Sequence, residues 1–169
     1  AVRSIPYMCV VRSGFKDMEV DFNQGQIFRH CTSDGQEYDI ILQSREHTFQ
    51  VEQESYTDYL IFVKSEAKQA KENSMVFQQK QRMEEGLEQI KASLSKPRGH
   101  KKVEQVHQRI GRLKTKYTRV AKAFDIETQT QQDKVTNLEW TYDSSLEQRN
   151  GCYIIRRSEP ITDIHQAWK

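Results

Sequence analysis

Apolar residues recur at spacings of three, four or seven through two stretches in the middle of the chain. In the first stretch these positions are Val76, Met83, Leu87, Ile90 and Leu94, and in the second they are Val103, Val106, Ile110, Leu113, Tyr117 and Val120. This is the heptad pattern that keeps one apolar stripe of a helix against a partner helix. Pro97 and Gly99 lie between the two stretches, where they break helix and permit a reversal of direction. The pattern predicts a long antiparallel helical hairpin, similar to a coiled coil, over residues 65–122.

Shorter apolar stretches before this hairpin have the pattern of β-strands. They predict strands over residues 5–11, 18–22, 26–30, 38–43, 48–52 and 59–63. Turn residues occur near Gly25, at 33–35 and near Asp58. Because the strands are short and follow one another closely, we expect antiparallel pairing in a meander. Ser65 ends this run, and its side chain is suited to cap the first helix.

Two alternating stretches after the hairpin, 123–129 and 134–140, predict a second pair of strands with a turn at 131–133. A further strand is expected over 152–156. Pro160 ends it, and residues 161–169 have the pattern of a beginning helix.

These elements together predict an α+β fold, in which an antiparallel β-rich module carries the long helical hairpin between its strand groups. The expected division is 1–12 as a core-like strand, 13–64 as a β-strand region, 65–122 as the helical hairpin, 123–157 as a β-strand region closing the same domain, and 158–169 as the start of a C-terminal helix. A chain of 169 residues has the size of one ordinary domain.

Composition indicates an intracellular protein. Charged residues make up 30% of the chain, and the longest apolar runs, such as 59–63, are far too short to cross a bilayer. No basic-then-apolar leader opens the sequence. The cysteines, Cys9, Cys31 and Cys152, are odd in number and lack a Cys-x-x-Cys spacing, which favours free thiols in a reducing cytoplasm. We therefore expect a cytoplasmic location and no membrane partner.

Charge is strongly segregated along the chain. Residues 96–122 contain ten Lys and Arg against one acid, Glu104, a local net charge of +9, while the remainder has 16 basic and 23 acidic residues, a net of −7. On a heptad wheel, seven cations share one flank of the second helix: Lys101, Lys102, Arg109, Arg112, Lys116, Arg119 and Lys122. The first helix offers that flank only Ser93, Gly86 and Gln79. On the opposite flank, Glu84 and Lys114 are placed to pair.

A cationic flank without an internal counter-charge points to an external anion, most often the phosphate backbone of nucleic acid. The prediction is that these seven side chains contact double-stranded DNA by phosphate neutralisation, without reading the bases. The same pattern is also typical of a solvated coiled-coil face, which remains the alternative.

Signals for catalysis and for metal binding are weak in the sequence pattern. There is no phosphate-cradling glycine loop, nucleophile elbow or His-Glu-x-x-His helix. His30 beside Cys31, and His100 seven residues before His107, lack the two ligand clusters of a zinc site. Trp140 and Trp168 are expected to pack, with base stacking as the alternative. We predict no catalytic residue and no metal ligand.

Four segments taken in order resemble bacterial insertion-sequence transposases. They are 59–72 (YLIFVKSEAKQAKE), 109–120 (RIGRLKTKYTRV), 124–127 (FDIE) and 151–156 (GCYIIR). The likeness is to the branch whose DDE catalytic core, an RNase H-like fold, is interrupted by an insertion before the final glutamate. It covers most of residues 57–165. Residues 7–12 (YMCVVR) are similar to the core strand after the second catalytic aspartate.

The resemblance implies a piece of a mobile-element enzyme for DNA transposition and recombination. In such enzymes three carboxylates hold two divalent ions, Mg²⁺ or Mn²⁺, that drive strand cleavage and transfer. The first two aspartates would precede Ala1 and the glutamate would follow Lys169, so Glu159 is not carried over as catalytic. The resemblance implies an insertion domain that is inactive alone, needs no cofactor itself, and contacts transposon-end DNA or helps assemble a homodimeric synaptic complex.

Two other functions fit the sequence. The helical hairpin could serve as a protein-interaction or dimerisation module without DNA contact. A self-sufficient nuclease is the third reading, and the missing carboxylate set argues against it.

Overall fold

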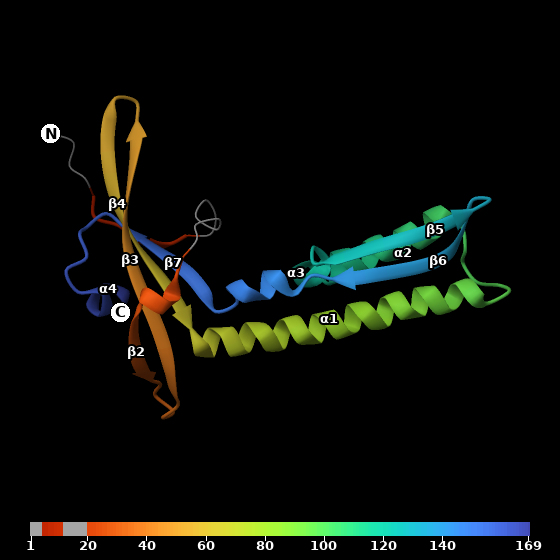
Figure 1. The fold of residues 1–169 in the computed structure, drawn as a ribbon, viewed down its shortest axis with the longest axis horizontal. Helices are drawn as coiled ribbons and strands as arrows, with labels where there is room; N and C mark the ends of the chain where they lie inside the picture. The colour runs from red at the N-terminus through yellow and green to blue at the C-terminus, as the bar shows by residue number, and fades with distance from the viewer. Residues whose placement is uncertain (1–4, 12–19) are drawn as a thin grey trace. The chain divides into compact units, whose positions relative to one another are not determined.

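The computed structural model describes residues 5–11 and 20–169, which fall into two compact units (Figure 1). The sheet unit comprises Ala1–Lys71 and Gly151–Lys169, and the middle unit comprises Glu72–Asn150. Both combine helix with antiparallel strands, so the α+β class is confirmed. Within the described residues, no helix is long and apolar enough to cross a membrane.

In the described part of the sheet unit, five antiparallel strands form one sheet in the order β1-β7-β4-β3-β2. Their bounds are Met8–Val10 for β1, Gln26–Cys31 for β2, Glu37–Val51 for β3, Glu54–Ser65 for β4 and Cys152–Arg157 for β7. The strands β2, β3 and β4 form the expected meander. The strand β7 arrives from the far end of the sequence and separates β1 from β4.

One face of this sheet carries the core of the sheet unit. Alternation along the strands places Ile40, Leu42, Ile61, Val63 and Ile155 on that face, where they pack with Ile164. Ile164 opens the short helix α4 (Ile164–Trp168), and the carboxylate of the preceding residue, Asp163, accepts the His165 and Gln166 N–H groups.

The turn expected near Asp58 is wrong, and so is the division of residues 38–52 into two strands. β3 runs unbroken to Val51, and the chain reverses at Glu52 and Gln53. Asp58 is buried inside β4, where its carboxylate accepts hydrogen bonds from the Tyr7 hydroxyl and the Arg156 guanidinium. Local propensity places an aspartate such as Asp58 in a turn, but here two partners distant in sequence hold it inside a strand.

Part of the strand predicted over 18–22 lies outside the described residues. Its end, from Phe22, belongs to a short 3₁₀ helix, η1 (Phe22–Gln24).

The first long helix, α1 (Glu66–Ser95), starts in the sheet unit directly after β4 and continues into the middle unit. The Ser65 hydroxyl accepts the Lys68 N–H at 3.4 Å, as a capping residue does. The apolar positions predicted on this helix, Val76, Met83, Leu87, Ile90 and Leu94, are all buried.

The middle unit encloses its core between α1, the helices α2 (Val103–Lys116) and α3 (Thr118–Ala121), and a two-stranded sheet of β5 (Phe124–Gln131) and β6 (Lys134–Tyr142). Buried residues of all these elements share one cluster, which includes Leu87, Ile110, Val120 and Leu138. Gln132 and Asp133 form the turn between the strands with positive φ, where the sequence predicted it. A 3₁₀ segment, η2 (Ser144–Arg149), follows β6.

The long helical hairpin predicted over 65–122 is not confirmed in that form. The second helix ends at Lys116, because Tyr117 adopts a non-helical conformation with φ −116° and ψ 50°. Its apolar stripe, like that of α1, packs against β5 and β6 as well as against the other helix. The strands expected over 123–157 also divide between two sheets, since β7 joins the sheet unit and β5 and β6 pair only with each other among the described strands.

Candidate nucleic-acid interface

Three of the seven predicted cations share one face of α2. Arg109, Arg112 and Lys116 are spaced by three and four residues, which places them side by side on a helix. They span about 10 Å along the helix axis at 1.5 Å per residue. The apolar residues Val106 and Ile110 face the core from another side of the helix.

Arg109 is half-buried and held by an uncharged partner. Its guanidinium donates to the Ser93 Oγ on α1 at 2.8 Å, and that hydroxyl donates to the Ile90 carbonyl oxygen at 2.6 Å. The contact fixes the side chain of Arg109 without neutralising its charge.

Arg112 and Lys116 are exposed to solvent. Lys116 Nζ lies 5.3 Å from the ring centroid of its neighbour Tyr117. Throughout the described residues, no carboxylate lies within ion-pair distance of any of the seven predicted cations. This face of α2 therefore keeps its full positive charge.

The other four cations do not lie on α2, so the single helical flank predicted for all seven is wrong. Lys101 and Lys102 precede the helix in extended backbone. The Lys101 carbonyl oxygen accepts the Val135 N–H at 2.7 Å, and the backbone of Lys102 forms an isolated antiparallel β-bridge with that of Lys134. Arg119 belongs to α3, beyond the break at Tyr117. Lys122 follows α3. The heptad wheel assumed one continuous helix, and the chain begins that helix later and interrupts it.

The ion pair predicted between Glu84 and Lys114 is also absent from the described contacts. That flank of α1 lies against β6 instead of α2. Lys80 Nζ is 4.1 Å from the ring centroid of Tyr142, and Lys91 Nζ is 5.5 Å from that of Trp140. In a two-helix arrangement Lys114 would lie beside this flank of α1, and in the structure β6 lies there instead.

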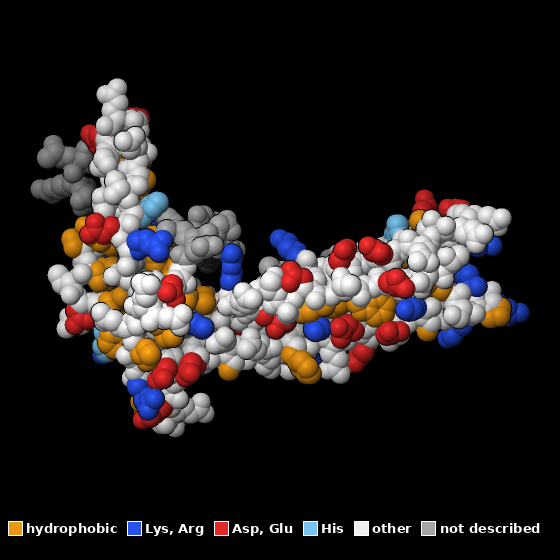
Figure 2. All heavy atoms as spheres, in the orientation of Figure 1, with side chains coloured by type: hydrophobic (Ala, Val, Ile, Leu, Met, Phe, Trp, Pro, Cys, Tyr) orange, Lys and Arg blue, Asp and Glu red, His pale blue; other side chains and the backbone are white. Residues whose placement is uncertain are grey.

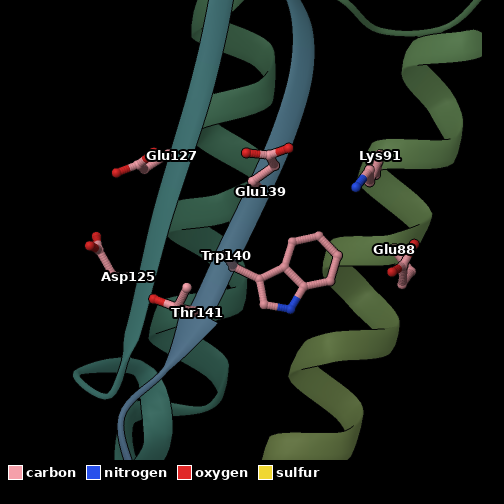
Figure 3. A pocket seen from close by; sticks show the side chains of 7 residues that line it. All are labelled: Glu88, Lys91, Asp125, Glu127, Glu139, Trp140 and Thr141. Carbon is pink, nitrogen blue, oxygen red and sulfur yellow. The ribbon is translucent and has the colours of Figure 1, made fainter.

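The strand side of the middle unit is acidic (Figure 2). A shallow pocket of about 500 Å³ lies there, lined by Glu88, Lys91, Asp125, Glu127, Glu139, Trp140 and Thr141 (Figure 3). Glu127 and Glu139 are directly opposite each other on β5 and β6, where like charges are unfavourable. The pocket has four carboxylates and one amine, so its net charge is negative. Electrostatic repulsion of phosphate therefore disfavours nucleic-acid binding on this side.

Both tryptophans pack, as predicted. Trp140 is half-buried against the core of the middle unit, and Figure 3 shows its ring between β6 and α1. Trp168 packs on the core of the sheet unit and donates from Nε1 to the Tyr153 hydroxyl at 2.9 Å.

No group of three or more His, Cys, Asp or Glu side chains is arranged to hold a metal ion in the part of the chain that the structure describes. His107 Nε2 lies 3.2 Å from Thr128 Oγ1, and His100 Nδ1 lies 3.3 Å from Gln105 Oε1. The cysteines Cys9 and Cys31 are free and exposed.

The sequence did not reveal the hydrogen-bonded group in which Tyr7 and Arg156 hold the buried Asp58. Burial and the hydrogen bond to Asp58 raise the pKa of Tyr7. The available signal was a lone acid beside a strongly apolar stretch, which predicts a paired charge as readily as a turn. The acidic residues of β5 were visible in the sequence as alternating carboxylates at Asp125 and Glu127.

Comparison of the chain with protein-family models, with curated proteins and with solved structures finds no match.

Proposed function

We propose that the middle unit binds the phosphate backbone of double-stranded DNA through the face of α2 that carries Arg109, Arg112 and Lys116. The observation that carries the proposal is the lack of any carboxylate partner for these cations among the described residues. The strand side of the middle unit is acidic and repels a polyanion, so the cationic face of α2 is the side that attracts one.

Binding of this kind depends on charge. Each cation that neutralises a phosphate releases condensed counterions, and the gain in free energy falls as salt rises. Arg112 is exposed and can present its planar guanidinium to two phosphate oxygens. The apolar side of α2 packs in the core, and its cationic face offers phosphate contacts without base-specific readout.

The resemblance to insertion-sequence transposases suggests in which process this DNA contact would serve. On that basis we propose that the chain is an insertion domain that grips DNA at transposon ends beside a separate DDE core. The metal-bound carboxylates of strand transfer would belong to that core.

Titration of a duplex oligonucleotide of arbitrary sequence over a range of salt concentrations tests the proposal. Three phosphate contacts predict a slope of log K against log salt of about −3. Arg112→Gln with Lys116→Gln should reduce the slope by about 2. The matched control is Lys114→Gln, an exposed lysine on another side of the same helix. Equal slopes for wild type and double variant, or an equal loss in the control, would remove this face from the binding surface.

A protein-interaction module is the second candidate, and one observation favours it. Phe77 on α1 is 68% exposed, and a large exposed apolar side chain is a common anchor for a partner. If this function holds, light scattering of the chain will show concentration-dependent dimers that Phe77→Ser abolishes, with no affinity for DNA.

A further inference from the structure

The strand β1 forms one edge of the sheet in the sheet unit and pairs only with β7 among the described strands. The Tyr7 carbonyl oxygen accepts the Ser158 N–H at 3.1 Å, and the Val11 N–H donates to the Ile154 carbonyl oxygen at 2.8 Å. Because alternate residues of an antiparallel strand bond to the same neighbour, Met8 and Val10 direct their backbone groups to the open edge. These groups have no hydrogen-bond partner within the described residues.

The side chains at this edge are apolar and exposed. Ile5 is 81% exposed, Met8 58% and Val10 60%. Val10 pairs with Ile155, which belongs to the core of the sheet unit, so the apolar face of the sheet continues onto β1 without cover by the described residues.

Residues 5–11 contain no charged side chain. The opposite edge strand, β2, carries Arg29 in an ion pair with Asp39, a charge of the kind that protects sheet edges from pairing. Residues 5–11, the part of the β1 edge that the structure describes, carry no such charge.

We propose that the β1 edge pairs with the same edge of a second copy of this chain, antiparallel and about a two-fold axis through Cys9. The two outward residues, Met8 and Val10, flank one central residue. An antiparallel copy therefore places Met8 opposite Val10 of the partner and Val10 opposite Met8 of the partner, and both pairs exchange backbone hydrogen bonds. Such an edge is self-complementary, as a two-fold interface requires.

The arrangement brings Cys9 opposite the partner's Cys9. Residues in this non-hydrogen-bonded position have Cα atoms about 4.5 Å apart, which lies within the range of a disulfide. Cys9 is exposed and free. A three-residue strand buries little area, so the dimer is weak and is best detected by covalent trapping.

The test uses the full chain with Cys31→Ser and Cys152→Ser, so that Cys9 alone remains, with diamide as the oxidant. We expect disulfide-linked dimers on a non-reducing gel. The reference for random collision is the chain that keeps only Cys31, which is also exposed. The proposal is overturned if dimers through Cys9 form no faster than dimers through Cys31, as they would if the edge served a strand of a different protein.

Val10→Lys should slow the trapping at least tenfold, because it places like charges in the paired edge. Ile27→Lys, a matched change of an exposed apolar residue on the edge strand β2, should leave it unchanged. Reaction of Cys9 with a soluble thiol reagent must be equal in the two variants, which separates loss of pairing from loss of β1. Equal trapping of both variants contradicts the proposal. The assay contains no DNA, so its outcome is independent of the function proposed for α2.

Discussion

Arg109 on α2 donates a hydrogen bond of 2.8 Å to the hydroxyl of Ser93 on α1. The partner of this guanidinium is a neutral oxygen, and no carboxylate of the described residues pairs with it. The consequence is a cation that is fixed in position and still fully charged.

Ser93→Ala should weaken DNA binding without changing its salt dependence. The variant loses the hydrogen bond to Arg109, which should cost about 1 kcal/mol of unfolding free energy, but it keeps every cation. Duplex titration should show a lower affinity at each salt concentration and an unchanged slope. The control is Ser95→Ala, an exposed serine at the end of the same helix. A reduced slope would mean that Ser93 affects the number of phosphate contacts.

Two helical glycines should respond differently to alanine. A Cβ at Gly111 meets nothing within 4 Å, whereas a Cβ at Gly86 would lie 2.6 Å from Leu113 Cδ2. Gly111→Ala should raise the unfolding free energy by up to about 1 kcal/mol through helix propensity. Gly86→Ala gains the same propensity and loses about 1 kcal/mol or more to overpacking. Urea denaturation of both variants measures the difference, and equal stabilisation would show that α1 and α2 do not approach closely at Gly86.

Asp58→Asn should destabilise the chain far more than Asp39→Asn. The Asp58 side chain is 5% exposed and paired with Arg156, so its neutralisation leaves a guanidinium without a counter-charge, at a cost of about 3 kcal/mol. The Asp39 side chain is 33% exposed and its partner Arg29 is 67% exposed, which predicts a loss below about 1 kcal/mol. Thermal unfolding of both variants gives the comparison. Similar losses would show that the group around Asp58 is not a buried pair.

Tyr142 should make stability depend on pH in the alkaline range. Its burial, and then its hydrogen bond to Glu147, raise the pKa of Tyr142 well above that of a free tyrosine. The unfolded chain releases this proton near about pH 10 while the folded chain keeps it, so the contribution is complete below about pH 10 and declines as pH rises further. Lysines titrate in the same range, so the quantity to follow is the difference in unfolding free energy between wild type and Tyr142→Phe. That difference should shrink between about pH 9 and pH 11, and a constant value would contradict the assignment.

Sequence periodicity was a good guide wherever an element packs by one stripe. The buried residues of α1 and the turn at Gln132 and Asp133 were both predicted. It was a poor guide where a third element intervenes. The heptads of 103–120 indicated a helix partner, and they could not show that β5 and β6 share the same core or that Tyr117 interrupts the helix.

Prediction of the candidate site from sequence periodicity had the same limitation: it could not account for contacts between elements distant in sequence. Arg109, Arg112 and Lys116 were placed on one face, because three residues on one helix follow from spacing alone. Lys101 and Arg119 were misplaced, because the ends of α2 depend on contacts distant in sequence, such as that between the Lys101 carbonyl oxygen and the Val135 N–H. The partners of Asp58 come from both ends of the chain and leave no local pattern.

The facing carboxylates of Glu127 and Glu139 have an effect on approach as well as on contact. With cations on α2 and anions on the strands, the middle unit has an electric dipole. In the field of a polyanion it experiences a torque, so it turns its helix forward before the surfaces meet. Under the proposed function, the acidic strands would shorten the search for a productive encounter with DNA without touching it.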